Sequence, residues 1–168
     1  RELEASVKRF DFVRARFHAS NLEFLRPESS ARYAALAEKA GLLRDLVARP
    51  GLLASKEAVN DFILRVRAVE RSLGPQADPD ILVMHAMVRW QTGSKRIQEY
   101  EAASLAARAL RLSPRGFALA PLARAYVQTF LETPYLPEDV GLSRYAATLS
   151  ELRESLAAAA VDDPDSPL

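Results

Sequence analysis

The stretch EYEAASLAARALRLSP, residues 99–114, sets the fold class of this chain. Its small residues Ala102, Ala106 and Ala109 recur at steps of four and three, so they share one face of an α-helix. A neighbouring helix can approach such a face closely. The proline that follows Ser113 has no backbone N–H and is expected to end the helix. The spacing therefore predicts a helix that packs tightly against another helix.

The remainder of the chain repeats this helical pattern. Apolar residues recur at steps of three and four, and no stretch shows the sustained alternation that is typical of a β-strand. Short turns between the periodic stretches predict helical hairpins. We therefore expect an all-α fold of about seven helices in irregular antiparallel hairpins, arranged as a repeat or a bundle. The expected ranges are 2–25, 28–47, 55–73, 79–91, 94–112, 114–131 and a last helix that begins at about residue 138.

Several residues predict where these helices begin. Ser55 is a plausible N-cap, and Asp78-Pro79 pairs an N-cap with a proline in the first turn. Ser113-Pro114 repeats that pairing, which predicts a very tight corner between two helices. Glu138 and Asp139 are expected at the start of the last helix, where carboxylates stabilise its dipole.

The expected helix over residues 2–25 contains most of the phenylalanines. Phe12 lies two positions from Phe10 and should point away from the buried stripe, so we predict that it contacts a partner or a second copy. Arginines interleave with these aromatic residues, but the sequence pI of about 8.3 is below that of typical nucleic-acid-binding domains, and we expect no nucleic-acid partner. The stripe expected to be buried comprises Leu3, Val7, Phe10, Val13, Phe17 and Phe24.

Length and composition predict a single domain over residues 1–168. Gly, Pro and polar residues cluster over residues 73–78, a candidate boundary between two subdomains, and the acidic, proline-containing residues 162–168 are expected to fray. Hydrophobic residues make up 49% of the chain and the mean hydropathy is -0.11, values typical of soluble globular proteins. The longest charge-free apolar runs, 81–88 and 116–123, fall far short of the roughly 20 residues that span a bilayer. We therefore expect a chain that does not span a membrane.

Charge is distributed unevenly although the net charge is only +1. Residues 131–168 contain two cations against eight acids, so the positive excess lies in residues 1–130. This asymmetry indicates either an anionic partner for the first part or complementarity between the two parts.

The residue types that most catalytic and metal sites require are sparse. The chain has no cysteine, which excludes disulfides, thiolate chemistry and Cys-ligated zinc. His18 and His85 are the only histidines, and His85 has no second histidine or carboxylate three or four residues away. The paired acids Asp78/Asp80 and Glu138/Asp139 lie at expected helix starts, where capping explains them. We predict no catalytic site, no metal and no cofactor.

One turn combines an aromatic residue with several cations. Arg89, Trp90, Lys95 and Arg96 surround the expected end of one helix and start of the next. Trp and Arg dominate interface hot spots, so these residues are a candidate binding site for an acidic or peptide partner. The alternative is a capping loop with Trp90 folded beneath it.

Part of the chain resembles a tetratricopeptide repeat. Residues 100–114 resemble the second helix of such a repeat, and Ala123-Arg124-Ala125-Tyr126 resembles the start of the next. The resemblance covers about a quarter of the chain and implies a scaffold whose inner face binds peptides or proteins. Pro50, Pro114 and Pro164 lie 64 and 50 residues apart rather than the usual repeat of roughly 34, so irregular hairpins remain an alternative.

These observations favour a non-catalytic protein-interaction domain, a scaffold or adaptor. Its Ala, Leu and Arg bias points to a bacterial protein of the cytoplasm or periplasm, and the start at Arg1 to a processed protein or an excised domain. The alternative is a sensory or regulatory domain that binds a small ligand in its helical core, and an enzyme is a third hypothesis. An open surface lined with aromatics favours a protein partner, whereas a closed apolar pocket favours a ligand.

Overall fold

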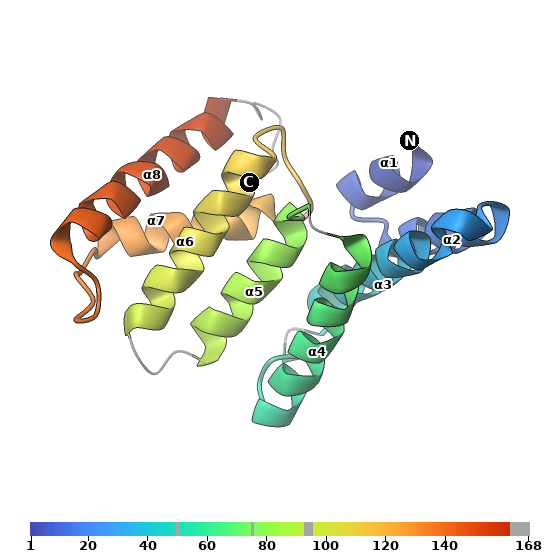
Figure 1. Ribbon diagram of the computed structural model, residues 1–168, viewed down its shortest axis with the longest axis horizontal. Coiled ribbons are helices and arrows are strands. Elements are labelled where there is room, and N and C mark those ends of the chain that lie inside the picture. Colours follow the sequence, from blue (N-terminus) through green and yellow to red (C-terminus); the bar gives the residue numbers. More distant parts are fainter. Residues whose placement is uncertain (50, 75, 93–95, 162–168) are drawn as a thin grey trace. The chain divides into compact units, whose positions relative to one another are not determined.

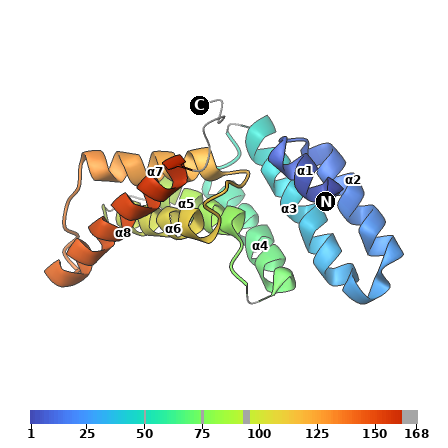
Figure 2. The ribbon, with the colours of Figure 1, turned by 90° about the horizontal axis from the view of Figure 1, so that it is seen from above.

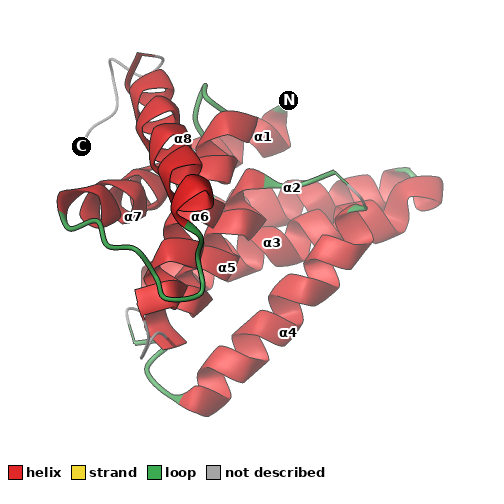
Figure 3. Ribbon diagram, turned by 60° about the vertical axis from the view of Figure 1, so that its left-hand side comes forward, coloured by secondary structure: helices red, strands yellow, loops and turns green. Residues whose placement is uncertain are grey.

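The computed structural model describes residues 1–49, 51–74, 76–92 and 96–161. These residues form α-helices and one 3₁₀ turn, and no strand occurs among them (Figure 3). The predicted all-α class is confirmed. The elements are α1 (Glu2–Lys8), α2 (Phe12–Leu25), the 3₁₀ turn η1 (Pro27–Ser29), α3 (Ser30–Ala48), α4 (Lys56–Leu73), α5 (Pro79–Thr92), α6 (Arg96–Leu112), α7 (Ala120–Glu132) and α8 (Leu142–Val161).

The chain packs as two compact units, Arg1–Ala77 and Asp78–Leu168. Helices α1 to α4 belong to the first unit and α5 to α8 to the second (Figure 1). Gly74 ends α4 with a φ of 93°, a left-handed conformation that glycine adopts without steric cost. The division between the units thus falls between this glycine-terminated helix and the start of α5.

In the first unit, α2 and α3 run side by side, α1 packs on α2, and α4 packs on α3 (Figure 2). The buried face of α4 follows the predicted steps of three and four, and Ser55 caps its start by accepting a hydrogen bond from the Ala58 N–H at 3.1 Å. The core of this unit includes Phe12, Ala15, Ala19, Leu42, Leu43, Val59, Phe62, Val66 and Val69.

The single helix expected over residues 2–25 is wrong, because the chain breaks between α1 and α2. Phe10 has a φ of 58°, which no α-helix accommodates. Asp11 then caps α2, its Oδ1 accepting a hydrogen bond from the Arg14 N–H at 3.0 Å. A new helix begins at Phe12, and its register is independent of α1.

In the second unit, α6 packs against α5, α7 and α8. Ala102, Ala106 and Ala109 are fully buried, so the predicted close-contact face of this helix is confirmed. The surrounding core includes Leu82, Val83, Tyr100, Leu110, Val127, Phe130 and Leu152.

Two expected helix starts in this unit are wrong. Helix α7 begins at Ala120, and residues 113–119 form a connection in which the Ser113 hydroxyl donates to the Gly116 carbonyl at 3.1 Å. Helix α8 begins at Leu142, so Glu138 and Asp139 lie in the preceding loop rather than in its first turn. The predicted start of α5 is confirmed, since Asp78 Oδ1 accepts a hydrogen bond from the Ile81 N–H at 3.2 Å.

Candidate interaction surface

The predicted cluster around Trp90 does not converge on one site. Arg89 Nε lies 3.4 Å from Glu101 Oε2 on α6, a pairing that the aliphatic length of arginine permits along neighbouring helices. The Trp90 ring stacks on Tyr126 of α7, with centroids 4.9 Å apart and an interplanar angle of 28°. Burial raises the pKa of Tyr126 to about 12. These contacts place Trp90 between α5 and α7, where it packs the unit together.

Arg96 has a different neighbour. Its guanidinium lies over the ring of Tyr135, 4.9 Å from the ring centroid. Tyr135 belongs to the loop between α7 and α8. The Tyr135 hydroxyl donates to the Arg96 backbone carbonyl and lies 3.1 Å from Glu99 Oε2. Burial and the Glu99 carboxylate raise the pKa of Tyr135 well above its ordinary value, so it remains a donor that ties this loop to α6. Lys95 lies outside the described residues.

Two hollows in the second unit bear on the small-ligand alternative. One, of about 510 Å³, lies between α6 and α8, and the Tyr100 hydroxyl lies 2.8 Å from Thr148 Oγ1 in its wall. The other, of about 540 Å³, lies where Arg96 and Ile97 face residues 135–139. Both are open and lined by charged side chains, unlike the closed apolar pocket that typically holds a small ligand.

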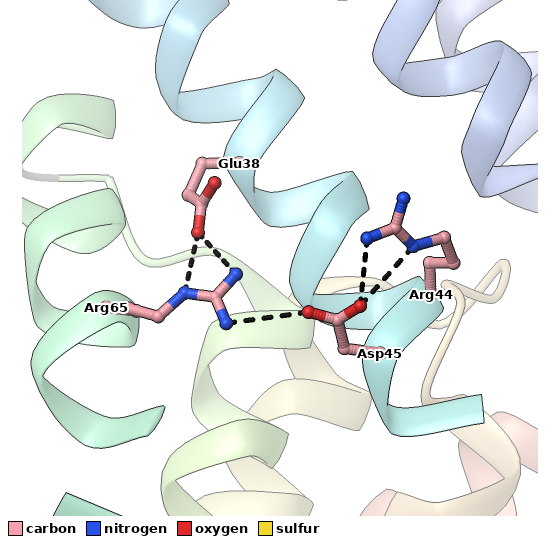
Figure 4. Close-up of polar contacts among 4 residues, drawn as sticks. All are labelled: Glu38, Arg44, Asp45 and Arg65. Atoms are coloured by element: carbon pink, nitrogen blue, oxygen red, sulfur yellow. Dashed lines mark hydrogen bonds and ion pairs between the residues drawn. The ribbon is translucent and has the colours of Figure 1, made fainter. Parts of the chain in front are cut away.

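Charged residues also gather in the first unit, between α3 and α4 (Figure 4). Arg65 points between two carboxylates, with Nη2 2.6 Å from Glu38 Oε1 and Nη1 3.5 Å from Asp45 Oδ2. Arg44 Nη2 lies 2.9 Å from Asp45 Oδ1. Burial alone would raise the pKa of Asp45, but the hydrogen bond and charge of Arg44, with Arg49 and Arg65, outweigh it, and the pKa lies below its ordinary value.

This arrangement explains the cluster as a structural contact. General acid catalysis requires a group that holds a proton near neutral pH, whereas Asp45 is held in its charged form. Arg65 is held in its charged form as well, since Glu38 and Asp45 raise its pKa against the opposing effect of burial. The cluster therefore pins α4 to α3.

The expectation that Phe12 points away from the buried face is wrong. Phe12 is only 5% exposed, and it shares the packed face of α2 with Ala15 and Ala19. Phe10 covers part of the same ring, with the two centroids 5.8 Å apart in an edge-on arrangement. The helical register set by Asp11 also reverses the environment of the residues expected to be buried.

Three of those residues instead form an exposed apolar surface on α2. Val13, Phe17 and Phe24 are separated by four and seven positions, so they share the face of α2 opposite its packed face. Their exposed fractions are 67%, 61% and 85%, and Phe10, immediately before the helix, is 53% exposed. Val13, Phe17 and Phe24 together are the α2 apolar face. Gathered large apolar side chains of this kind mark interaction sites.

Arginines flank the α2 apolar face. Arg14 and Arg16 are exposed on α2, and Arg9 and Arg26 are exposed near its two ends. Arg14 Nε lies 3.8 Å from Asp11 Oδ2, a long contact between two exposed side chains that stabilises little. On another side of the helix, His18 Nδ1 lies 3.5 Å from Glu2 Oε2 of α1. The exposed surroundings of the apolar face are thus mainly cationic.

Two further features are absent from the ranges that the structure describes. Nowhere in them do three or more His, Asp or Glu side chains gather as they would around a metal ion. No helix in the same ranges has the length and hydropathy needed to cross a membrane. Comparisons with protein-family models, with curated proteins and with solved structures find no match.

Proposed function

We propose that this chain is a non-catalytic helical interaction domain, a scaffold or adaptor of a larger bacterial protein or assembly. The observation that supports this function is the α2 apolar face. Fully burying one large apolar side chain that was exposed contributes about 1.5–3 kcal/mol. A protein partner that covers this face gains a contribution of this size from each large apolar side chain that it buries. The core of the chain does not have to rearrange for this contact.

The two hollows described above are poor sites for a small apolar ligand. The hollow between α6 and α8 is bordered by the Arg89–Glu101 ion pair and by Glu151, which lies 3.2 Å from Arg111. A ligand there would have to compete with ion pairs and with water. The tetratricopeptide-like character of residues 100–126 belongs to the same proposal, because the scaffold it implies also binds proteins.

Site-specific photocrosslinking in the native host tests this function. A photoreactive phenylalanine analogue replaces Phe17, and a matched variant carries it at Leu64, which is 63% exposed on α4. We expect a protein adduct of defined mass from position 17 and none from position 64. Mass spectrometry identifies the partner segment in this adduct. The adduct should be lost when Phe24 is also replaced by Ser. Absence of any protein adduct specific to position 17 would overturn the proposal.

A further inference from the structure

The α2 apolar face has the dimensions of a helix-docking site. From Val13 to Phe24 it extends over three turns of α2, roughly 16 Å. The stripe is one side chain wide, because Ser20 and Asn21 are polar and exposed on its two sides. A helix laid alongside can match such a narrow stripe with its own residues at i, i+3 or i+4, and i+7.

The charges beside the stripe specify the partner further. At about 100° per residue, Arg14 and Arg16 fall roughly 80° to either side of the line through Val13, Phe17 and Phe24. Arg9 and Arg26 add exposed cations near its ends. The carboxylates nearest the stripe are less available to a partner than these arginines, because Asp11 caps the helix and Glu23 is half-buried. A helix with carboxylates on both sides of its apolar face would place a negative charge near each flanking arginine.

We infer that the α2 apolar face binds an acidic amphipathic helix of a partner protein. This inference rests on the proposed docking function and adds the chemistry of the segment that docks. Its apolar residues cover Val13, Phe17 and Phe24, and its Asp or Glu side chains on either side pair with Arg14 and Arg16.

The same observations disfavour two other occupants. An anionic lipid surface is bound by a broad apolar face with many cations, whereas this stripe is narrow and only Arg14 and Arg16 flank it along its length. A second copy would bring the same positively charged flanks against one another, which destabilises the contact. Both are outcomes that the experiment below distinguishes.

A pair of synthetic peptides tests the inference with the whole chain. Each is a fluorescent helix of about four turns with Leu at i, i+3, i+4 and i+7. One carries Glu at the flanking positions and the other carries Lys. We expect the Glu peptide to raise the fluorescence anisotropy at concentrations at least about tenfold below those of the Lys peptide, as charge complementarity requires.

Three double variants locate the contact. Phe17→Ser with Phe24→Ser should abolish binding of the Glu peptide, and Arg14→Gln with Arg16→Gln should weaken it and reduce its salt dependence. Leu64→Ser with Arg67→Gln makes one change of each kind on the exposed face of α4 and should bind as the unaltered chain does. Circular dichroism checks that each variant is folded. Even if the phenylalanine variant does not fold, the comparison of the two peptides on the unaltered chain still decides the outcome.

Several results would overturn the inference. These are equal affinity for the two peptides, no binding of either, pelleting with phosphatidylglycerol vesicles in place of peptide binding, or a dimer in sedimentation that Phe17→Ser abolishes. The crosslinking experiment separates this failure from that of the proposed function. A Phe17 adduct with a protein segment that is not an acidic helix keeps the function and overturns the inference, whereas no protein adduct overturns both.

Discussion

Phe12 and Phe17 lie five positions apart on α2 and have opposite environments. Phe12 is 5% exposed in the core of the first unit, whereas Phe17 is 61% exposed. Removing a buried aromatic ring loses its transfer free energy and leaves a cavity, but removing an exposed ring loses neither. This pair therefore provides a direct measure of the register of α2.

The first prediction compares the two alanine variants. We expect Phe12→Ala to lower the free energy of unfolding by about 3–5 kcal/mol. Phe17→Ala should change it by no more than about 0.5 kcal/mol. Urea denaturation followed by circular dichroism measures both. Equal losses would show that the packed face of α2 is assigned incorrectly.

Asp45 provides the second prediction, which concerns pH. Its pKa is lowered in the folded state, so the carboxylate stabilises the fold above the unfolded value of about 3.9, and this contribution is lost as the pH falls through the lower folded value. Asp45→Asn should cost about 1.5–3 kcal/mol at pH 7, the value of a hydrogen bond to a charged group.

The two chains should therefore converge in stability as the pH falls below about 4. Urea denaturation between pH 7 and pH 2.5 measures this difference. Asp61→Asn, an exposed position on α4, is the control and should follow the unaltered chain. A difference between Asp45→Asn and the unaltered chain that is independent of pH would contradict the assigned ion pairs.

Asp11 explains why the sequence did not predict the α2 apolar face. A stripe of apolar residues runs from Leu3 to Phe24 at helical steps, and a single continuous helix buries all of it. Aspartate is a favoured N-cap, so the signal for a new helix at Phe12 was present. The apolar periodicity from Leu3 to Phe24, which continues across the break between α1 and α2, outweighed this N-cap signal in the prediction. Restarting the register at Asp11 exposes Val13, Phe17 and Phe24 together.

At the scale of elements, α6 is the centre of the second unit. Its alanines remove side-chain bulk from the contact, which allows α5, α7 and α8 to pack on one helix. The small residues that indicate this close packing recur at helical spacing within α6 itself, so the sequence predicted both the helix and its buried face. Added volume at that face must push a neighbouring helix away or force side chains from their preferred rotamers.

The third prediction tests that packing. Ala106→Leu should lower the free energy of unfolding by about 1–3 kcal/mol, because Ala106 is fully buried. Arg108→Leu, on the exposed side of the same helix, inserts the same side chain and should change stability by no more than about 0.5 kcal/mol. Chemical denaturation of both variants measures the difference. If the two variants are equally stable, the alanine face is not a close contact.

Helix α7 shows where local sequence patterns fail. Its start is held by Asp80 of α5, whose Oδ1 accepts a hydrogen bond from the Leu119 N–H at 2.9 Å. Ser113-Pro114 predicted a start six residues earlier, since a cap from a distant part of the chain leaves no mark on the sequence near the helix. The carboxylate of Asp80, 2% exposed, is thus a structural group of the fold.

The fourth prediction follows from this cap. Asp80→Ala removes a buried acceptor and should cost about 1–3 kcal/mol, while Asp80→Asn keeps an acceptor oxygen and should cost less. Hydrogen exchange should show faster exchange of the Leu119 amide in Asp80→Ala. Unchanged protection of that amide would contradict the cap.

At the scale of the whole molecule, the candidate surface and the core around α6 belong to different units. The α2 apolar face belongs to Arg1–Ala77, whereas the core around α6 draws all its buried residues from Asp78–Leu168. The all-α class was predictable because helical periodicity is local. The exposure of one helix face was not, because it depends on which elements pack on that helix.

The last prediction concerns the independence of the second unit. A polypeptide of residues 78–168 contains the complete core of α5 to α8, including Leu110 and Leu152. It is long enough to bury roughly 60% or more of its unfolded surface, so it should fold alone. We expect a helical circular dichroism spectrum and one cooperative urea transition, which Leu110→Ala should shift by about 2–5 kcal/mol, as in the whole chain. A broad transition that Leu110→Ala leaves unchanged would show that this core requires residues 1–77.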